Sequence, residues 1–394
     1  MLSFSNTEIA FSSQTNKELK SSFLLFKFIS YPVLLKIGKP LLNIALWLHL
    51  PVEGLIKATV FNHFCGGENL SDTEQMIQHL GKNKVKSIPD YSVEGKESDE
   101  DFDRVTNEII SIISFAKGNA NIPFAVFKPS GLARISLLEK ASTLLSETKN
   151  KLSKEEEKEY QKIVERIDSI CKSAFEASVP VMIDAEESWI QDVIDSIVED
   201  MMKKYNREKA IVYNTIQMYR HDRLNFLKKT VEKSLKENWI PGFKIVRGAY
   251  MEKERKRAEE KKYPSPIHET KTEVDTDYNL ALDFCLEYFP KVAIFAGTHN
   301  EESCAHLAKK MKEKNIEKSD ERIYFSQLFG MSDNISFNLA SEGYNVAKYI
   351  PYGPVKDVVP YLIRRAEENT SVAGQTGREL KLITSEITRR KQKN

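Results

Sequence analysis

Short apolar runs alternate with longer amphipathic stretches over most of this chain, beginning after Gly81. Each run ends in polar, Gly or Pro residues, and a stretch with helical spacing of its apolar positions follows. This alternation is typical of βαβ units, in which helices join parallel strands. The apolar runs are 86–93, 124–129, 179–186, 210–217, 243–250, 292–300, 323–328 and 346–353. Eight such units predict an α/β fold of the (βα)8 TIM-barrel type, with a doubly wound parallel sheet as the structural alternative.

The chain before the first run has a different pattern. Residues 1–85 predict a region of helices, and Ser71 with Glu74 three residues later forms a capping box that predicts a helix start. The segment at about 135–178 is rich in Lys and Glu and predicts two helices inserted between the second and third strands. We therefore predict an N-terminal helical region, 1–85, and a catalytic barrel, 86–394, that carries this insertion.

Composition narrows the class of protein. Of the 394 residues, 41% are hydrophobic and 29% are charged, which is the balance of a globular chain with a real core. The formal net charge of +1 selects neither nucleic acid nor an anionic surface as a partner. The four cysteines are scattered without a CxxC pair, so we expect neither a disulfide framework nor structural zinc, and a reducing compartment.

The first fifty residues carry no clear targeting signal. Acidic residues come early and the first arginine is Arg104, which does not fit a mitochondrial transit peptide. The apolar stretch 23–50 is broken by lysines and prolines, and its longest uncharged run, 40–52, is too short to span a bilayer. It predicts amphipathic helices, either over a core or in peripheral membrane contact, because lysines lie among Phe, Leu and Trp47. The predicted location is cytoplasmic, with peripheral contact on the inner face of the cell membrane as the variant.

The stretch 349–369 carries a distinctive group of side chains. An apolar strand ends in a Pro-Tyr-Gly-Pro turn, and a helix is predicted to begin near Lys356. Helical spacing places four residues on one broad face: Tyr361, Arg364, Arg365 and Glu368. Two adjacent guanidinium groups can bind a carboxylate bidentately while the glutamate holds one of them. The alternative is a solvated helix surface with salt bridges.

Polar residues end most of the predicted strands, and in a barrel the reactive groups lie at those ends. Asp184 and Glu186 could act as acid–base carboxylates, or could pair with Lys128 or Arg247 and orient them. The strand-end residues are Lys128, Asp184, Glu186, Gln217, Arg247, Gly248, Ala249, Tyr250, Thr298, His299, Asn300, Gln327, Leu328 and Tyr349. Together with the arginine pair, they predict an enzyme that acts on a small carboxylate.

Other site classes are not supported by the sequence. The seven histidines are dispersed and HExxH is absent, so we predict no metal site. The chain has neither GxGxxG after a strand nor GxxxxGK[ST], which excludes a Rossmann fold and a P-loop. The residues alone leave the reaction type open, although Tyr250, Tyr349 and Tyr361 suggest an aromatic-lined pocket.

Five motifs, in this order along the chain, resemble those of the proline dehydrogenase family. They are 181–187 (VMIDAEE), 244–250 (KIVRGAY), 295–300 (FAGTHN), 325–331 (FSQLFGM) and 349–369. The resemblance covers about residues 86–372 and is nearest to eukaryotic-type, monofunctional members. It implies FAD bound noncovalently in a distorted (βα)8 barrel, oxidation of L-proline to Δ1-pyrroline-5-carboxylate as the first step of proline catabolism, and transfer of electrons to a membrane quinone. The product would be released or handed to a pyrroline-5-carboxylate dehydrogenase partner.

The same resemblance implies a role for each matched residue. Arg364, Arg365 and Lys128 would hold the proline carboxylate, Glu368 would orient the arginines, and Asp184 would lie beside the flavin and the lysine. The residues that would line the ring pocket are Tyr349, Tyr361, Ala249, Tyr250, Leu328 and Ile245. The residues that would touch FAD are Gln217, Lys244, Arg247, Gly248, Lys271, Thr298, His299 and Asn300.

Three other functions stay open at this point. Tyr349 would fill the space near C4 of the substrate ring and favour proline over hydroxyproline, whereas a hydroxyproline dehydrogenase needs room there. A barrel lyase could use Lys128 as a Schiff base. A non-catalytic amino-acid sensor could keep the arginine pair without flavin.

Overall fold

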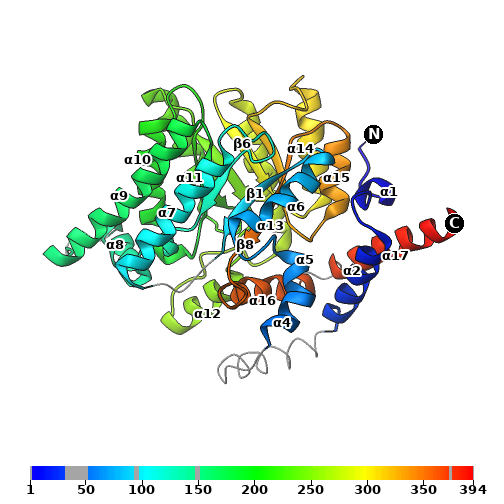
Figure 1. The fold of residues 1–394 in the computed structure, drawn as a ribbon. Coiled ribbons are helices and arrows are strands. Elements are labelled where there is room, and N and C mark those ends of the chain that lie inside the picture. Colours follow the sequence, from blue (N-terminus) through cyan, green and yellow to red (C-terminus); the bar gives the residue numbers. More distant parts are fainter. Residues whose placement is uncertain (1, 32–51, 93–96, 147–150, 372–374, 394) are drawn as a thin grey trace. The chain divides into compact units, whose positions relative to one another are not determined.

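The computed structural model of the chain confirms the predicted fold, a nearly closed barrel of eight parallel strands with flanking helices (Figure 1). It describes residues 2–31, 52–92, 97–146, 151–371 and 375–393. The strand order is β1-β8-β7-β6-β5-β4-β3-β2. The strands are β1 (Val85–Tyr91), β2 (Ala125–Phe127), β3 (Val181–Ile183), β4 (Val212–Gln217), β5 (Gly242–Val246), β6 (Ala293–Gly297), β7 (Ile323–Leu328) and β8 (Val346–Tyr352). Every predicted apolar run therefore overlaps a strand.

Helices follow the strands along the chain, as the alternating pattern predicts. They are α7 (Asp99–Ala116), α8 (Ile135–Ser146), α9 (Lys154–Ala177), α10 (Ser188–Tyr205), α11 (Arg223–Glu237), α12 (Met251–Lys261), α13 (Lys271–Glu287), α14 (Glu301–Glu313), α15 (Asp333–Ser341) and α16 (Val355–Ser371). A short 3₁₀ turn, η2 (Pro129–Gly131), follows β2. Two of these helices, α8 and α9, occupy the segment where two inserted helices were predicted.

The chain groups into two compact units. The central unit comprises Gly95–Ser326, and the split unit comprises Met1–Glu94 together with Gln327–Asn394. The end of β7 thus belongs to the split unit, as do β1 and β8. The predicted boundary between a helical region, 1–85, and a barrel, 86–394, stays a prediction.

Aromatic rings fill the interior of the central unit near the strand starts. The ring of Phe124 packs edge-on against three others: Tyr213 at 5.3 Å, Phe295 at 5.1 Å and Tyr324 at 5.0 Å between centroids. The strand register pairs Phe295 with Tyr324 on one side and with Lys244 on the other, so all three side chains face the same side of the sheet. Large aromatic residues dominate core energetics, and here they fill the part of the interior away from the polar strand ends.

The split unit begins with short helices. They are α1 (Thr7–Ala10), α2 (Asn16–Ile29), α4 (Glu53–Ile56), the π-helical η1 (Lys57–Phe61), α5 (Asn62–Phe64) and α6 (Leu70–Lys82), and the chain closes with α17 (Gln375–Lys393). The start of α6 corrects the capping box predicted at Ser71. The cap is Asn69, whose side chain accepts a hydrogen bond from Asp72 N at 3.0 Å. Asn is as strong a cap as Ser, and it comes two residues earlier.

The basic chain end is anchored on the first helices. Glu386 on α17 is fully buried and accepts hydrogen bonds from Arg389 and Arg390. Burial alone would raise the pKa of Glu386, but these hydrogen bonds outweigh it and lower the pKa to about 2. Arg390 also donates to the Phe11 and Gln14 carbonyls at 2.8 and 2.9 Å. A basic chain end usually predicts a solvated tail, but these contacts leave Arg389 and Arg390 partly buried, and only the residues from Lys391 to Lys393 are exposed.

The apolar stretch 23–50 is only partly described, because residues 32–51 lie outside the described ranges. Its described part belongs to α2 and the two residues after it. Across the ranges that the structure describes, no helix combines the length and the apolar character that crossing a membrane requires. The described part of the stretch is thus one amphipathic helix.

Candidate active site

Asp184, directly after β3, is the centre of a charged group in the central unit. Its Oδ1 accepts a hydrogen bond from Lys244 Nζ at 2.6 Å, and its Oδ2 lies 3.7 Å from Lys128 Nζ. The Lys244 and Asp184 side chains are only 9% and 13% exposed. The structure thus brings together two lysines and one carboxylate, all of them predicted site residues: Lys128 and Asp184 directly follow β2 and β3, and Lys244 lies within β5. The sequence left open whether Asp184 acts in acid–base chemistry or pairs with Lys128 or Arg247. In the structure Asp184 pairs with Lys128, and the cation nearest to it is Lys244.

Glu186 faces a different partner. Its carboxylate accepts hydrogen bonds from the Ser130 amide, at 2.8 Å, and from the Ser130 hydroxyl, and its own amide donates to Gln191 Oε1. Burial raises the pKa of Glu186 to about 7, although the Ser130 hydrogen bonds act in the opposite direction. Because Ser130 is part of η2, directly after Lys128, the contact fixes the turn that carries this lysine. Glu186 is therefore placed to orient Lys128 through the backbone.

Arg247, directly after β5, is held by three hydrogen bonds. Its Nε donates to Asp275 at 2.7 Å, and its two Nη groups donate to Thr298 Oγ1 at 2.6 Å and to Ser303 Oγ at 2.9 Å. The guanidinium also lies 4.4 Å from the centroid of the Tyr278 ring. The carboxylate that pairs with Arg247 is Asp275 of α13. The alternative in which Asp184 or Glu186 pairs with Arg247 is therefore wrong.

Lys271 joins the same group through Asp275, whose Oδ2 it contacts from the first turn of α13. Burial opposes ionisation of Asp275, but the hydrogen bonds from Lys271 and Arg247 outweigh it and lower its pKa. The Thr298 hydroxyl also accepts from the Asn300 amide at 3.0 Å, and the Asn300 side chain caps α14 by accepting from Ser303 N. The structure thus gathers most of the residues predicted to touch FAD at adjoining strand ends.

Gln217 shows a feature that a ligand would explain, and Gly248 shows a close approach within the chain. Gln217 ends β4, is 2% exposed, and its Oε1 has no hydrogen-bond partner within the described part of the chain. A buried acceptor without a donor is costly and uncommon. Gly248 has φ +128°, and a Cβ there would lie 2.5 Å from the Tyr219 ring. Only glycine fits that position, because the Tyr219 ring packs directly against its backbone. His299 lies partly buried between β6 and α14.

The ring-pocket residues of the central unit differ in placement. Lys244 and Ile245 are neighbours in β5, so their side chains point to opposite faces of the sheet. Since Lys244 faces the interior with Asp184, Ile245 faces the helices and is fully buried there. The prediction that Ile245 lines the ring pocket is therefore wrong. Ala249 is exposed and Tyr250 is partly buried, with Lys253 Nζ lying 5.2 Å from its ring centroid.

A buried lysine anchors the turn after β7 in the split unit. Lys348 on β8 is 0% exposed and donates to the carbonyls of Met331, at 2.7 Å, and Leu328, at 3.3 Å. Its charge is balanced by Asp333, at 2.8 Å. Tyr349 follows Lys348, is 5% exposed, and its carbonyl accepts from Phe329 N at 2.9 Å. The turn that carries Leu328 is therefore tied to the strand that carries Tyr349.

The predicted arginine pair lies on α16, which begins one residue before Lys356. Arg365 is 7% exposed, and its guanidinium lies 5.1 Å from the centroid of the Tyr361 ring. Arg364 is partly buried. Glu368 lies on the same helix, but its side chain falls outside the described residues. The alternative of a solvated helix surface is wrong for Tyr361 and Arg365, because both are buried.

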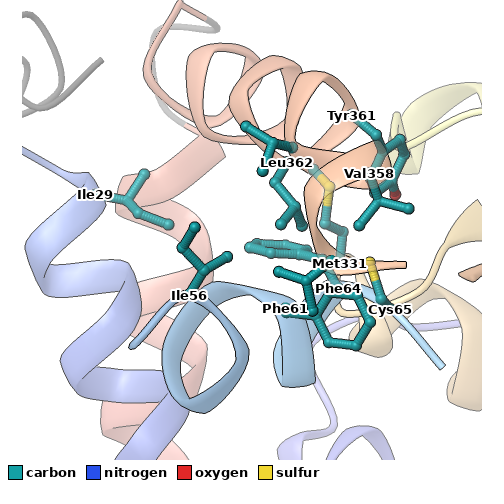
Figure 2. Packing of buried hydrophobic residues seen from close by; sticks show 11 residues of the cluster. Ile29, Ile56, Phe61, Phe64, Cys65, Met331, Val358, Tyr361 and Leu362 are labelled. Carbon is teal, nitrogen blue, oxygen red and sulfur yellow. The ribbon is translucent and has the colours of Figure 1, made fainter. Parts of the chain in front are cut away.

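An apolar cluster in the split unit supports α16 and is shown in Figure 2. Tyr361 and Leu362 of this helix pack with residues from the turn after β7 and from the helices before β1. Leu328 packs against the same cluster. The buried members are Ile29, Ile56, Phe61, Phe64, Cys65, Met331, Val355, Val358, Val359, Tyr361 and Leu362. Leu328 and Tyr361, both predicted ring contacts, thus share one set of neighbours.

Sequence reasoning missed several supporting residues. Asp275 lies four residues after Lys271 on a helix, a spacing that suggests a salt bridge and could have revealed it. Glu254 on α12 is fully buried and accepts from the Ser188 amide and hydroxyl, both at 2.6 Å, which ties α12 to the start of α10. No local pattern indicates this contact. In the described part of the chain, no group of three or more His, Cys, Asp and Glu side chains is arranged to hold a metal.

Comparison with known proteins gives one consistent family. Residues 73–378 match the family described as proline dehydrogenase. The mitochondrial proline dehydrogenase 1 of Dictyostelium discoideum is 33% identical over 98% of this chain and 74% of its own length. The carbapenem antibiotics biosynthesis protein CarD of Pectobacterium carotovorum is also 33% identical, over 86% of each chain. The solved structure of proline utilization A from Bdellovibrio bacteriovorus has the same fold, with a TM-score of 0.71 at 20% identity. That match covers 93% of this chain and 38% of the other.

Proposed function

Because this chain belongs to the proline dehydrogenase family, we propose that it oxidises L-proline to Δ1-pyrroline-5-carboxylate with FAD bound noncovalently. The observation that carries the proposal is the Asp184 group, in which two buried or half-buried ammonium groups share one carboxylate. Such a group holds fixed positive charge in a site of low dielectric, where charge acts strongly. It suits a reaction whose substrate is a carboxylate and whose cofactor becomes more negative.

The residues of the central unit fit a flavin. The buried Oε1 of Gln217 lacks a donor within the described chain, and the pyrimidine edge of a flavin carries an N–H that such an oxygen accepts. Arg247, Lys244 and Lys271 would supply positive charge, and Thr298, His299 and Asn300 would complete the contacts. With FAD bound, the chemistry supplied is hydride acceptance from the ring carbon beside the proline nitrogen.

The substrate carboxylate would be held by Arg364, Arg365 and Lys128. A guanidinium binds a carboxylate with two parallel hydrogen bonds, and Arg365 is already desolvated and stacked near Tyr361. Tyr361, Leu328 and Tyr349 would give the apolar ring its surface, with Tyr250 and Ala249 completing it. Glu368 would keep the arginines oriented.

The proline amine must lose its proton before hydride can leave the neighbouring carbon. Asp184, the buried carboxylate nearest the predicted cofactor residues, is engaged by Lys244 and Lys128. We therefore propose that the chain orients the ring and stabilises developing negative charge, and that solvent takes the proton. Under this scheme the rate rises with pH as more of the bound proline becomes neutral.

The test of this function is an absorbance spectrum of the purified protein before and after anaerobic addition of proline. We expect the bands of oxidised flavin, and we expect proline to bleach them. Bands that proline leaves unchanged would keep the cofactor and reject the substrate. A protein that stays colourless after reconstitution with FAD would reject the proposal. Borohydride trapping on Lys128 with substrate would then identify a lyase, and proline binding alone would identify a sensor.

We further propose that a membrane quinone accepts the electrons and that α2 makes peripheral membrane contact. Three large apolar residues just before the undescribed segment are exposed: Leu24 by 65%, Phe28 by 56% and Tyr31 by 53%. Lys20 and Lys27 are exposed beside them, a combination that favours an anionic lipid surface. We expect the protein to sediment with anionic vesicles more than with zwitterionic ones, and Phe28→Ser to weaken this. Equal sedimentation with both would reject the contact.

The product would be released or passed to a pyrroline-5-carboxylate dehydrogenase, which we propose as a partner. Consumption of the imine by a separate dehydrogenase removes a reactive product. With the partner supplied with its own oxidant, a complex should shorten the lag before the second oxidation begins, relative to the lag expected for product that diffuses between separate enzymes. A lag equal to that of two non-interacting enzymes would reject this part of the proposal.

A further inference from the structure

The helices between Glu53 and Phe64 form a continuous segment with an unusual turn at its middle. The α-helical α4 is followed by the π-helical η1 and then by α5. A π-helical turn inserts extra residues and changes the direction of the side chains that follow it. Phe61 and Phe64 leave this turn on the buried side, with exposures of 1% and 0%. We call residues 53–67 the brace.

The first contact of the brace is apolar and lies against α16. Phe61 and Phe64 pack in the same cluster as Val358 and Leu362, two residues of the predicted substrate helix (Figure 2). Tyr361, a predicted ring contact, belongs to this cluster as well. The direction of the face that carries Arg364 and Arg365 therefore depends on what packs beneath the helix.

The second contact is polar and lies against the turn after β7. His63 Nε2 is 2.9 Å from the carbonyl oxygen of Gly330. Because a carbonyl only accepts, Nε2 carries the hydrogen, and the partly buried ring lies between Phe26 and Phe64 at 5.3 and 4.6 Å between centroids. Burial lowers the pKa of His63, although Asp333 acts in the opposite direction. The hydrogen bond from Nε2 therefore ties the brace to the Gly330 carbonyl.

Gly330 shows how closely the two segments approach. Its φ is +75°, and a Cβ there would lie 2.3 Å from the His63 carbonyl oxygen and 3.1 Å from Phe64 Cδ1. Neither the backbone angle nor the space admits another residue without a shift. The carbonyls of Leu328 and Met331, on either side of Gly330, are held by Lys348. The turn that presents Leu328 is thus fixed from one side by β8 and from the other by the brace.

The third contact joins the brace to the end of β8. Gly66 N donates to the Pro351 carbonyl at 2.8 Å, and Gly353 N donates to the Gly67 carbonyl at 3.1 Å. Gly67 also pairs with Tyr352 as a parallel bridge. A Cβ on Gly66 would lie 2.3 Å from a methyl group of Ile350. The brace therefore fixes the exit of β8, three residues after Tyr349 and just before α16 begins.

We propose that the brace positions the substrate-binding surface of the split unit, with His63 as its positioning residue for the turn that carries Leu328. Each of the three contacts described above lies within three residues of a residue predicted to touch the substrate, and none of the three ends at a residue predicted to touch the cofactor. The proposal rests on the proposed proline oxidation and deepens it. If the brace instead only fills the core, losing one of its hydrogen bonds should change stability and leave affinity for proline unchanged.

The test compares three variants of the full-length flavoprotein. His63→Ala removes the hydrogen bond to Gly330, His63→Gln keeps an N–H donor, and His79→Ala is the matched control because His79 is exposed on α6. Proline KM and kcat are measured with a soluble dye as acceptor, together with flavin content and thermal midpoint. Binding of tetrahydrofuran-2-carboxylate, which keeps the ring and carboxylate without an oxidisable amine, is followed by the change in flavin absorbance.

We expect His63→Ala to raise KM and the dissociation constant of the analogue by roughly three- to tenfold, which is the range of one net hydrogen bond. Flavin content should stay full and kcat should change less than twofold by this estimate. His63→Gln should recover most of the affinity, and His79→Ala should match the parent. Restoration by an N–H donor is a result that a general loss of packing does not give.

Two outcomes would overturn the inference. One is a His63→Ala protein with a lower thermal midpoint and an unchanged KM, and the other is an equal KM increase in the Gln and Ala variants. If His63→Ala does not fold, Phe61→Leu replaces it, because leucine stays apolar but lacks the ring. The same result is then expected, a raised KM for proline with little change in kcat. A parent protein whose flavin proline does not reduce would instead reject the proposed function, so the two failures are distinguishable.

Discussion

In the central unit, the side chains at the strand ends hold one another by charge and hydrogen bonds. Asp184 joins two lysines, and Arg247 fills three acceptors from three different side chains. In the split unit, the arginine helix α16 is held by apolar packing against Phe61, Phe64 and Met331. Charged contacts fix direction tightly, because each has a preferred angle and distance. Apolar contacts fix position through shape, and small changes in volume shift them.

The difference matches the two tasks that we propose. A cofactor that remains bound needs a site whose polar groups are already satisfied, or lack only the ligand, as with Gln217 Oε1. A small substrate that enters and leaves on every turnover needs a surface that defines its shape. On this view, mutations in the two regions have different signatures: loss of stability and flavin on one side, loss of substrate affinity on the other.

The largest effect is expected at Asp184. Asp184→Asn removes the charge that two lysines share, and breaking one side of a buried ion pair costs about 3–5 kcal/mol of the free energy of unfolding. Flavin content should fall with it. Urea denaturation near neutral pH measures the change, and Asp192→Asn, at a side chain 53% exposed, is the control that should cost less than about 1 kcal/mol. Similar losses in both variants would contradict a special role of charge in this region.

The next effect is expected in the apolar cluster. Leu362→Ala removes a buried side chain and leaves a cavity, which costs about 3 kcal/mol. Leu362→Met keeps the volume and should cost less than about 1.5 kcal/mol. Both are read by urea denaturation, with proline KM measured alongside. If Leu362→Ala lowered flavin content and left KM unchanged, the assignment of this region to the substrate would be wrong.

A pH effect is expected from Glu186. Its folded pKa of about 7 lies above its ordinary value of 4.5, so the unfolded chain releases this proton first as pH rises. Stability from this group is complete below about pH 4.5 and is lost as pH rises through 7, by roughly 2–3 kcal/mol between about pH 5 and pH 8. Glu186→Gln should flatten that part of the stability profile. The free energy of unfolding is measured by urea denaturation at both pH values for the parent and the variant. If it falls by the same amount in both proteins, Glu186 is not the group responsible.

The smallest effect concerns substrate shape. Tyr349→Ser opens space on the predicted ring surface, so the ratio of kcat/KM for 4-hydroxyproline to that for proline should rise about tenfold. The parent protein should strongly prefer proline. Lys356→Ala, at an exposed position on α16, should leave the ratio unchanged. Equal activity of the parent on both substrates would refute the role given to Tyr349.

The strands and the polar groups at their ends could be predicted because both are local signals. An apolar run indicates a buried strand, and the polar or Gly residue after it indicates where the strand ends. Both signals lie within a few residues, and each predicted run overlaps a strand. The prediction that Ile245 lines the ring pocket was wrong, and the sequence alone contained the reason. Neighbours in one strand cannot face the same side, so the place given to Lys244 ruled out Ile245.

The hydrogen-bond partners of some side chains could not be predicted, because they depend on which elements of the fold pack together. Glu254 meets Ser188 across 66 positions, and His63 meets Gly330 across 267. Nothing in the spacing of these residues encodes the contact. The same holds for the basic chain end, where Arg390 binds the carbonyls of Phe11 and Gln14 between α1 and α2, more than 370 positions away.

The split unit also has a consequence for synthesis. Its two segments are separated by the whole central unit, and the apolar face that ends at Phe61 and Phe64 has its partners, such as Leu362, in the second segment. A ribosome adds about 5–20 residues per second, so the first segment waits roughly 15–60 s before its partner emerges. The central unit can form its own core during that time. A nascent chain must therefore carry an uncovered apolar surface for most of its translation, which makes this surface a natural point of contact for chaperones.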